Sequence, residues 1–213
     1  AAADVVAGCG GQVLGGHSIH CKEPVFGLCV FGFVHPESVW HKAGAKPGDS
    51  LMLSKPLGTG VLLSAGDAVG IDTAVQSMRA TSRDAAAVLA AGVVPPSAVT
   101  DVTGYGLVGH AAEMAQRSQV GFNIDSGKVP LLDGALDAAR GGAGTSADAK
   151  LRQTPDITLA AGLDPVVAQL LYDPQTSGGL LAAVNDAEVS RLASSGFQQI
   201  GVVEAGPAAV VIS

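Results

Sequence analysis

T-D-V-T-G-Y-G-L-V-G-H, residues 100–110, is the stretch around which the rest of the chain is arranged. It places the carboxylate of Asp101 and the hydroxyl of Thr103 just before glycines that can open a helix. Carboxylate and hydroxyl oxygens suit a hard cation, and backbone N–H groups at a glycine-rich helix start can approach an anion. The alternative is an ordinary strand-to-helix turn, since Asp, Thr and Gly are also common cap and turn residues. Alone, the motif favours the ordinary turn, and the surrounding sequence decides between the two.

The composition indicates a chain that folds around an aliphatic core. Its 213 residues allow one large domain or two smaller ones, and hydrophobic residues make up 47% with only 4% aromatic. Together with 29 glycines, this is typical of an α/β or α+β enzyme. A formal net charge of −7 with only 12 Lys and Arg residues argues against a nucleic-acid partner, because neutralising phosphates needs clustered basic residues.

The three cysteines, Cys9, Cys21 and Cys29, form no C-x-x-C pair. An odd number without a signal peptide predicts reduced thiols and a cytoplasmic location, and we expect Cys9 to be buried as a small apolar side chain. No apolar run reaches the roughly eighteen residues of a membrane span, so no membrane partner is expected. The chain starts with an apolar segment and no Met, which leads us to expect that an N-terminal portion is missing.

The pattern of apolar residues predicts strands and helices mixed along the chain after residue 50. A strand at 98–102 and a helix at 106–117 flank the opening motif, so His110 falls inside that helix, where we interpret it as a structural residue. We expect further strands at 51–54, 121–125, 180–184, 197–203 and 208–212. Further helices are expected at 72–91, with Asp72 as its cap, and at 130–140. A short helix is expected to start at Asp164 and Pro165. A last helix is expected to end at Gly196, after Asn185 and Glu188 at capping-box spacing.

The segments outside this pattern have their own interpretations. Residues 1–14 fit the end of a helix followed by a short buried strand, and residues 25–34 fit a strand buried on both faces. Residues 42–50 look like a domain linker. The polar, glycine-rich stretch 141–155 is either a loop that covers a substrate or disordered.

Three further turns carry groups that could bind an anion or a metal. G-G-H-S at 15–18 makes a plausible anion contact, with a Gly-Gly turn capped by Ser as the alternative. K-P-L-G-T-G at 55–60 resembles a phosphate-binding loop, but its Lys precedes the glycines and no G-K-[ST] follows, so we favour a structural turn. L-Y-D-P-Q-T-S-G-G-L at 171–180 gathers more donors and acceptors than a plain turn needs.

These stretches together resemble one known family. With G-G-H-S at 15–18, K-P-G-D-S-L-M-L-S-K-P-L-G-T-G at 46–60, the opening motif and D-P-Q-T-S-G-G-L-L at 173–181, the chain resembles the selenophosphate synthetases (selenide, water dikinases) nearly end to end. The resemblance implies an α/β fold of the α+β type, with two domains built like those of aminoimidazole ribonucleotide synthetase (PurM). Residues 1–48 would be the remaining part of an incomplete N-terminal ATP-binding domain, and residues 49–213 the C-terminal α/β domain.

The resemblance also implies an activity and a set of site residues. The family makes selenophosphate from selenide, ATP and water, releases AMP and orthophosphate, uses Mg²⁺ bound to ATP, and acts as a homodimer. Mapped onto this sequence, Gly16, His17 and Ser18 would contact the nucleotide, and Asp101 would bind Mg²⁺. The family's catalytic Cys or selenocysteine and its Lys would lie before Ala1. No catalytic residue is therefore assigned here, and the chain alone is expected to be inactive.

Two alternatives stay open at this point. The first is a related ATP-dependent small-molecule kinase or synthetase of the same superfamily. The second is a non-catalytic module that keeps the fold and dimerises through residues 25–34. His20 stands where some members of the family carry Asp, which is a departure within the G-G-H-S loop.

Overall fold

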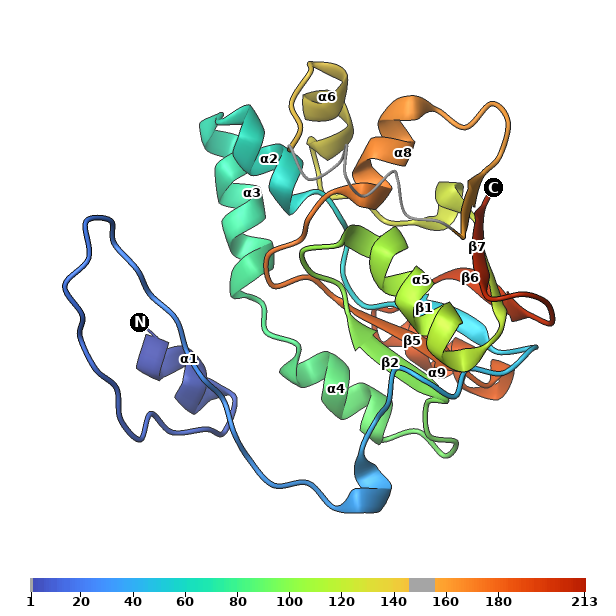
Figure 1. Cartoon of the computed structure of the whole chain (residues 1–213), viewed down its shortest axis with the longest axis horizontal. Helices are drawn as coiled ribbons and strands as arrows, with labels where there is room; N and C mark the ends of the chain where they lie inside the picture. The colour runs from blue at the N-terminus through green and yellow to red at the C-terminus, as the bar shows by residue number, and fades with distance from the viewer. Residues whose placement is uncertain (1, 146–155) are drawn as a thin grey trace. The chain divides into compact units, whose positions relative to one another are not determined.

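The structure, a computed structural model, describes residues 2–145 and 156–213. The chain divides into two units, Ala1–Val39 (unit 1) and Trp40–Ser213 (unit 2) (Figure 1). The domain boundary expected at 48/49 remains a prediction. The two interpretations of the 141–155 stretch concern mainly residues 146–155, which lie outside the described residues.

Unit 1 is mostly irregular chain. Its described residues form two regular elements, α1 (Ala2–Gly8) and the 3₁₀ helix η1 (Pro36–Ser38). The strands expected within 1–14 and at 25–34 are wrong, because residues 9–35 adopt neither helix nor strand. An isolated apolar segment has no ladder to join when its own unit offers no neighbouring strand. Phe26 and Phe31 are consequently 79% and 75% exposed.

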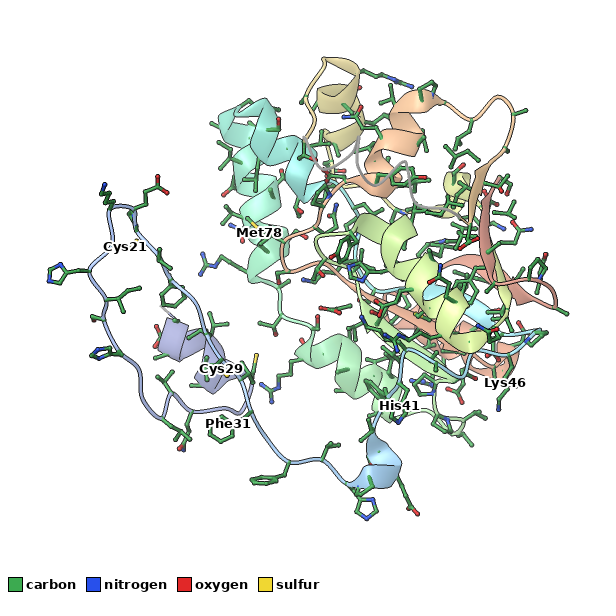
Figure 2. The ribbon with its side chains drawn as sticks, in the orientation of Figure 1. Cys21, Cys29, Phe31, His41, Lys46 and Met78 are labelled. Carbon is green, nitrogen blue, oxygen red and sulfur yellow. The ribbon has the colours of Figure 1, made fainter. Side chains whose placement is uncertain are left out.

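The cysteines of unit 1 are also exposed. Cys9, Cys21 and Cys29 are free thiols, and the last two lie along the irregular chain that carries Phe31 (Figure 2). The expected burial of Cys9 is therefore wrong. Helix α1 ends at Gly8, immediately before Cys9, and residues 9–14 that follow are all exposed.

Unit 2 is built on a seven-stranded mixed sheet with the strand order β2-β5-β1-β6-β3-β7-β4. The strands are β1 (Ser50–Leu53), β2 (Ala98–Asp101), β3 (Gly121–Ile124), β4 (Ile157–Leu159), β5 (Leu180–Val184), β6 (Gln198–Glu204) and β7 (Ala209–Ile212). Strand β7 pairs in parallel with β3 and β4, and the other pairs are antiparallel. The strand expected at 98–102 is confirmed, and so are the five other strands expected beyond residue 50. Strand β4, which has only three residues, was not expected.

Helices cover both faces of the sheet. Successive side chains of a strand point to opposite faces. From β1, Leu51 and Leu53 pack with α5 (Gly106–Ser118), whereas Met52 packs with α4 (Arg83–Ala90) and α9 (Val189–Ser194). This double coverage explains why β1 and β5 are nearly continuous apolar runs rather than alternating ones.

A third cluster of buried side chains lies among four helices that gather at one end of unit 2 (Figure 1). These helices are α2 (Thr59–Ala65), α3 (Ala68–Arg79), α6 (Ala135–Arg140) and α8 (Pro165–Tyr172). Asp164 caps α8 with Pro165 at its first position, as expected. Among the described residues, unit 2 also contains two short 3₁₀ helices, η2 (Ser126–Lys128) and η3 (Asp186–Glu188). In the described part of the chain every helix is too short or too polar to traverse a bilayer.

The long helix expected at 72–91 is wrong in its extent. The structure has α3 and α4 there, separated where Ala80 adopts an extended conformation with φ −68° and ψ 108°. Asp67 rather than Asp72 caps α3, since its side chain accepts a hydrogen bond from the Gly70 N–H at 2.8 Å. An apolar stripe at helical spacing can run through two helices in succession, so periodicity alone does not locate the break.

Two other helix starts differ from expectation. The helix expected at 130–140 begins only at Ala135, because residues 130–132 run beside Leu57, which exchanges backbone hydrogen bonds with Pro130 and Leu132. The capping box before α9 does not form: the Glu188 carboxylate accepts from the N–H groups of Val93 and Val94 instead.

Candidate active site

Three of the motif turns meet at one edge of the sheet. In the antiparallel ladders of β5, Leu180 pairs with Asp101 and Leu181 pairs with Leu53, so β1 and β2 end where β5 begins. The Val102 N–H donates to the Gly179 carbonyl at 2.8 Å, and the Leu180 N–H donates to Ser54 Oγ at 2.8 Å. The turns at 55–60, 101–106 and 173–179 are therefore neighbours in space although they are distant in the chain.

Gln175 joins these three turns through its buried side chain and backbone. It is 3% exposed, and its Oε1 accepts from the Gly58 N–H at 3.1 Å, the Thr59 N–H at 3.3 Å and the Thr59 hydroxyl at 3.2 Å. Its Nε2 donates to the Asp173 carboxylate at 2.9 Å. Its backbone N–H donates to the Thr103 carbonyl at 2.9 Å. One amide residue thus holds the Asp101 turn against the start of α2.

The start of α2 is closed by protein groups. Gly58 at the N-cap position has no side chain to offer, and the first N–H groups of a helix lack intrahelical partners. Asp173 accepts from the Gly60 N–H at 3.0 Å, while Gln175 accepts from the two preceding N–H groups. A carboxylate and an amide thus take the place that a phosphate would hold at such a helix start. This agrees with the structural interpretation of K-P-L-G-T-G.

Lys55 ties the same region to the end of α3. Its ammonium donates to the carbonyls of Ser77 at 3.1 Å and Ala80, and to the carbonyl of Ser177 at 2.8 Å. Burial lowers the pKa of Lys55 from its ordinary value. All three ammonium hydrogens are engaged by backbone, so Lys55 acts as a helix C-cap and as a clamp on the 173–179 turn.

The 101–106 turn is open by comparison. Tyr105 occupies the N-cap position of α5 without a side-chain cap, and the Asp101 side chain is exposed. Gly106 has φ +65°, and a Cβ there would lie 2.7 Å from the carbonyl of Tyr172, so this position requires glycine. The motif therefore places an exposed carboxylate beside the start of a 13-residue helix that no side chain caps.

His110 lies one turn into α5, and its buried side chain contacts Thr103 and Tyr105 of the 101–106 turn. It is 5% exposed, its Nε2 lies 3.1 Å from the Thr103 hydroxyl, and the Tyr105 ring contacts its edge at a centroid distance of 5.7 Å. Burial lowers the pKa of His110, opposed by the charges of Asp101 and Glu113 and reinforced by Lys42. The ring is therefore neutral near pH 7.

The G-G-H-S residues lie in unit 1, whereas Asp101 lies in unit 2. Gly16, His17 and Ser18 are exposed and belong to irregular chain. His17 and Ser18 line an open hollow of about 580 Å³ together with residues 19 and 21–26. Their assignment as nucleotide contacts remains a prediction.

Asp101 is a single carboxylate, and the described residues bring no three His, Cys, Asp or Glu side chains together as a metal site. Magnesium bound to a nucleotide takes most of its ligands from phosphates and water, with one or two carboxylates from the protein. The exposed Asp101 side chain fits one such ligand and does not form a metal site by itself.

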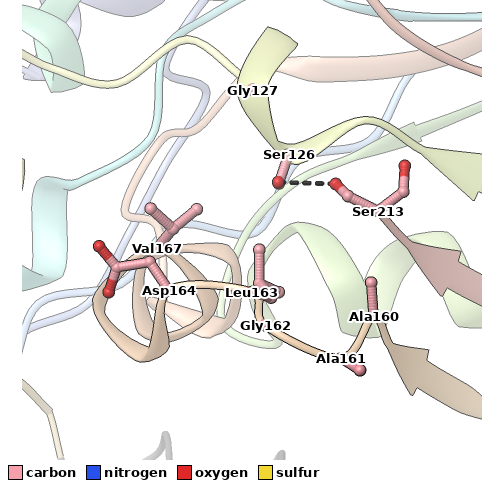
Figure 3. A pocket seen from close by; sticks show the side chains of 9 residues that line it. All are labelled: Ser126, Gly127, Ala160, Ala161, Gly162, Leu163, Asp164, Val167 and Ser213. Atoms are coloured by element: carbon pink, nitrogen blue, oxygen red, sulfur yellow. Dashed lines mark hydrogen bonds between the residues drawn. The ribbon is translucent and has the colours of Figure 1, made fainter.

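A second hollow has a volume of about 410 Å³, and Figure 3 shows the side chains that line it. Small and apolar groups between η2, the start of α8 and Ser213 line most of it, and Asp164 is its charged side chain. None of the four motifs contributes a lining residue.

Sequence reasoning singled out 171–180 for its density of polar groups but did not assign Asp173, Gln175 or Lys55 a role. A usable signal was present, since a helix that starts at Gly58 without a capping side chain needs acceptors from elsewhere. Two buried polar side chains in one turn, Asp173 and Gln175, are the acceptors that satisfy it.

Comparison with known proteins places the chain in a family. It belongs to the family described as AIR synthase related protein, C-terminal domain, whose model matches residues 46–213. Within that family its named relatives are selenide, water dikinases, which confirms the resemblance seen in the motifs. Selenide, water dikinase 2 of Peptoclostridium acidaminophilum is 40% identical over 199 residues, covering 90% of this chain and 56% of the relative. Selenide, water dikinase of Burkholderia cenocepacia is 41% identical over 223 residues, covering 98% and 62%. The chain thus spans a little more than half the length of these relatives.

Solved structures confirm the expected fold. Thiamine-monophosphate kinase from Stenotrophomonas maltophilia K279a superposes with a TM-score of 0.56 at 18% identity, over 82% of this chain and 52% of that one. Hydrogenase maturation protein HypE in complex with ATP superposes with a TM-score of 0.57 at 20% identity, over 84% and 51%. Identities this low carry the fold alone.

Proposed function

We propose that this chain is part of a selenide, water dikinase, an ATP-dependent enzyme that forms selenophosphate from selenide and water and releases AMP and orthophosphate. The observation that carries the proposal is the cluster of three motif turns at one sheet edge, in a chain 40% identical to a protein of that name. A cytoplasmic location, and the absence of nucleic-acid and membrane partners, remain predictions.

Two groups of residues would contact the nucleotide and its metal. Gly16, His17 and Ser18 would bind phosphate oxygens through backbone N–H groups and short polar side chains. Asp101 would supply one oxygen ligand to Mg²⁺, which neutralises phosphate charge when bound. The exposure of the Asp101 carboxylate beside an uncapped helix start supports this assignment.

A homodimer is proposed as the functional state. The support is the run of exposed apolar side chains at 25–34, where Val30, Phe31 and Phe33 are 75% or more exposed. Monomeric proteins rarely leave such a run uncovered. Light scattering at several concentrations tests this, and a monomer throughout the range would contradict it.

The activity is tested by measuring selenide-dependent AMP release from ATP. The assay compares the 213-residue chain with a chimaera that adds the part of the Peptoclostridium acidaminophilum relative lying outside the match. We expect AMP release from the chimaera and none from the chain alone, because one carboxylate does not hold a magnesium triphosphate. AMP release without selenide, or ADP release when thiamine monophosphate replaces selenide, would assign the chain to another ATP-dependent activity.

Asp101→Asn in the active chimaera tests the metal ligand. We expect the Mg²⁺ concentration for half-maximal AMP release to rise about tenfold, as the loss of one charged contact of about 1.5 kcal/mol implies. Asp67→Asn, which alters an exposed helix cap instead, is the matched control and should leave the Mg²⁺ dependence unchanged. An unchanged Mg²⁺ dependence in Asp101→Asn would make Asp101 a structural residue.

A further inference from the structure

The turn at 173–179 is buried except near its tip. Asp173, Gln175 and the two glycines at 178 and 179 are buried, whereas Thr176 and Ser177 are exposed. The backbone carbonyl of Ser177 accepts a hydrogen bond from the Lys55 ammonium at 2.8 Å. Its side-chain hydroxyl has no hydrogen-bond partner within the described part of the chain. The fold of unit 2 therefore fixes the backbone of Ser177 and leaves its hydroxyl unused.

Ser177 carries a side chain where the backbone favours glycine. Its φ is +52°, in the left-handed region, where a residue with a Cβ is strained. Of the other described non-glycine residues with positive φ, Gln119 is the C-cap of α5, and Asp156 is of a type that tolerates this region. Neither account applies to Ser177. Strain of this kind is concentrated at sites that bind or transform a ligand.

The ammonium of Lys55 places a positive charge beside Ser177. Besides the carbonyl of Ser177, it binds two carbonyls at the end of α3, and no ion pair between described residues includes it. Burial lowers the pKa of Lys55, and no neighbouring carboxylate opposes this effect. Carbonyl dipoles solvate the ammonium but do not cancel its charge. A partly buried cation without a counter-charge attracts an anion to the surface of this turn.

We propose that the Ser177 hydroxyl donates a hydrogen bond to an anionic oxygen, of the phosphate class, that binds against residues 176–179. Lys55 attracts this anion through its charge and does not touch it, since carbonyls engage its three hydrogens. The contact adds to those proposed for residues 16–18 and Asp101, because it uses the turn before β5 and no helix start. That the anion is a substrate or product of selenophosphate synthesis rests on the proposed function, whereas the donor role of Ser177 does not.

Three substitutions at residue 177 separate the hydroxyl from the strain. Ser177→Gly removes both, Ser177→Ala removes the hydroxyl alone, and Ser177→Asn keeps a donor on a residue that tolerates positive φ. We expect Ser177→Gly to raise the melting temperature by about 2 °C, and Ser177→Ala to melt within about 1 °C of the wild type. A Gly variant that melts below the wild type would show that the side chain stabilises the fold, which would overturn the inference.

Anion binding is measured on the 213-residue chain without metal, from the amide shift of residue 177 during titration with orthophosphate and with AMP. We expect the Gly and Ala variants to bind about tenfold more weakly, the effect of losing one hydrogen bond to a charged group, and the Asn variant to stay within about threefold of the wild type. Tighter binding of AMP would identify a nucleotide phosphate as the ligand, and tighter binding of orthophosphate a free phosphate group. No shift with either probe, or wild-type affinity in the Ala variant, would overturn the inference.

The contribution of the positive charge is tested with Lys55→Gln, whose amide still donates to carbonyls but is neutral. We expect its orthophosphate affinity to fall about fivefold. Lys46→Gln, at an exposed lysine outside the three turns, is the matched control and should bind as the wild type does. Equal losses in the two variants would show a general effect of net charge and contradict an anion at this turn. Failure of the AMP assay alone would refute the proposed function and leave the orthophosphate result standing.

Discussion

The turns at 55–60 and 101–106 look alike in sequence and differ in structure. Both follow a strand, contain Gly and Thr, and start a helix that lacks a capping side chain of its own. The first is closed, because Asp173 and Gln175 bind its N–H groups and Thr59 is 1% exposed. The second is open, with an exposed Asp101 and an uncapped α5. A glycine-rich helix start is therefore a ligand site only if the protein has left it unfilled.

The largest expected effect comes from opening the closed turn. Gln175→Ala would leave two buried N–H groups at the start of α2 without acceptors, and we expect the free energy of unfolding to fall by about 3 kcal/mol. Chemical denaturation measures it. Thr176→Ala, at the exposed neighbouring position, should change stability by less than about 0.5 kcal/mol. Equal losses of unfolding free energy in the two variants would contradict the role of Gln175 in closing the start of α2.

The open turn is more sensitive at its backbone than at its side chains. Gly106→Ala would place a Cβ 2.7 Å from the Tyr172 carbonyl at a φ of +65°, and we expect a loss of about 2 kcal/mol. Gly104→Ala is the control, since nothing lies within 4 Å of a Cβ there. Thermal melting of both variants checks the difference, and a tolerant Gly106 would argue that this turn can rearrange.

The Glu188 carboxylate also accepts hydrogen bonds from backbone N–H groups, those of Val93 and Val94. Because this carboxylate can be protonated, the stability that it contributes depends on pH. Hydrogen bonds from the Val94 N–H and from Arg191 lower the pKa of Glu188 from its ordinary value of 4.5. A lowered folded pKa contributes stability that is present above the unfolded value and lost as the pH falls through the folded one. Glu188→Gln should therefore be less stable than the wild type above pH 4.5, with the gap closing in more acidic solution. Urea midpoints of both proteins across this pH range measure the difference in stability. A difference that does not change with pH would exclude ionisation of Glu188 as its cause.

The smallest effect on stability is expected at Asp101. Because its side chain is exposed, Asp101→Asn should change the free energy of unfolding by less than about 0.5 kcal/mol. Asp173→Asn, buried at 1% exposure in the closed turn, should be destabilised by more. A larger loss at Asp101 than at Asp173 would reverse the assignment of open and closed turns.

Local pattern sufficed for every strand of the sheet of unit 2 except β4, whose three residues are too few to show a pattern. Strands such as β1 and β5 are short apolar runs bounded by polar turns, and α5 has its apolar stripe and a glycine-rich start within one stretch. The resemblance between motifs likewise pointed to Asp101, because the residues that carry it are contiguous. These features depend on neighbours in the sequence.

The features that sequence reasoning missed depend on distant residues. Lys55 holds the end of α3, and backbone pairing beside Leu57 delays the start of α6. The groups that fill the start of α2 come from residues more than 110 positions away in the chain. Residues 25–34 have the composition of a strand, but no segment of unit 1 pairs with them. No window of local sequence contains these partners.

The sheet pairing described above also sets when the fold can appear during synthesis. Among the described residues, every ladder joins one of β1–β4 to one of β5–β7, and no two of the first four strands pair with each other. When synthesis has reached residue 179, the four strands β1–β4 therefore still lack their partners, and their apolar side chains remain unpaired in the sheet. The sheet of unit 2 therefore cannot form strand by strand from its N-terminal side, and its long-range pairings predict slow folding. The emergence of residues 180–212 marks the earliest moment at which the edge that carries Asp101 can exist.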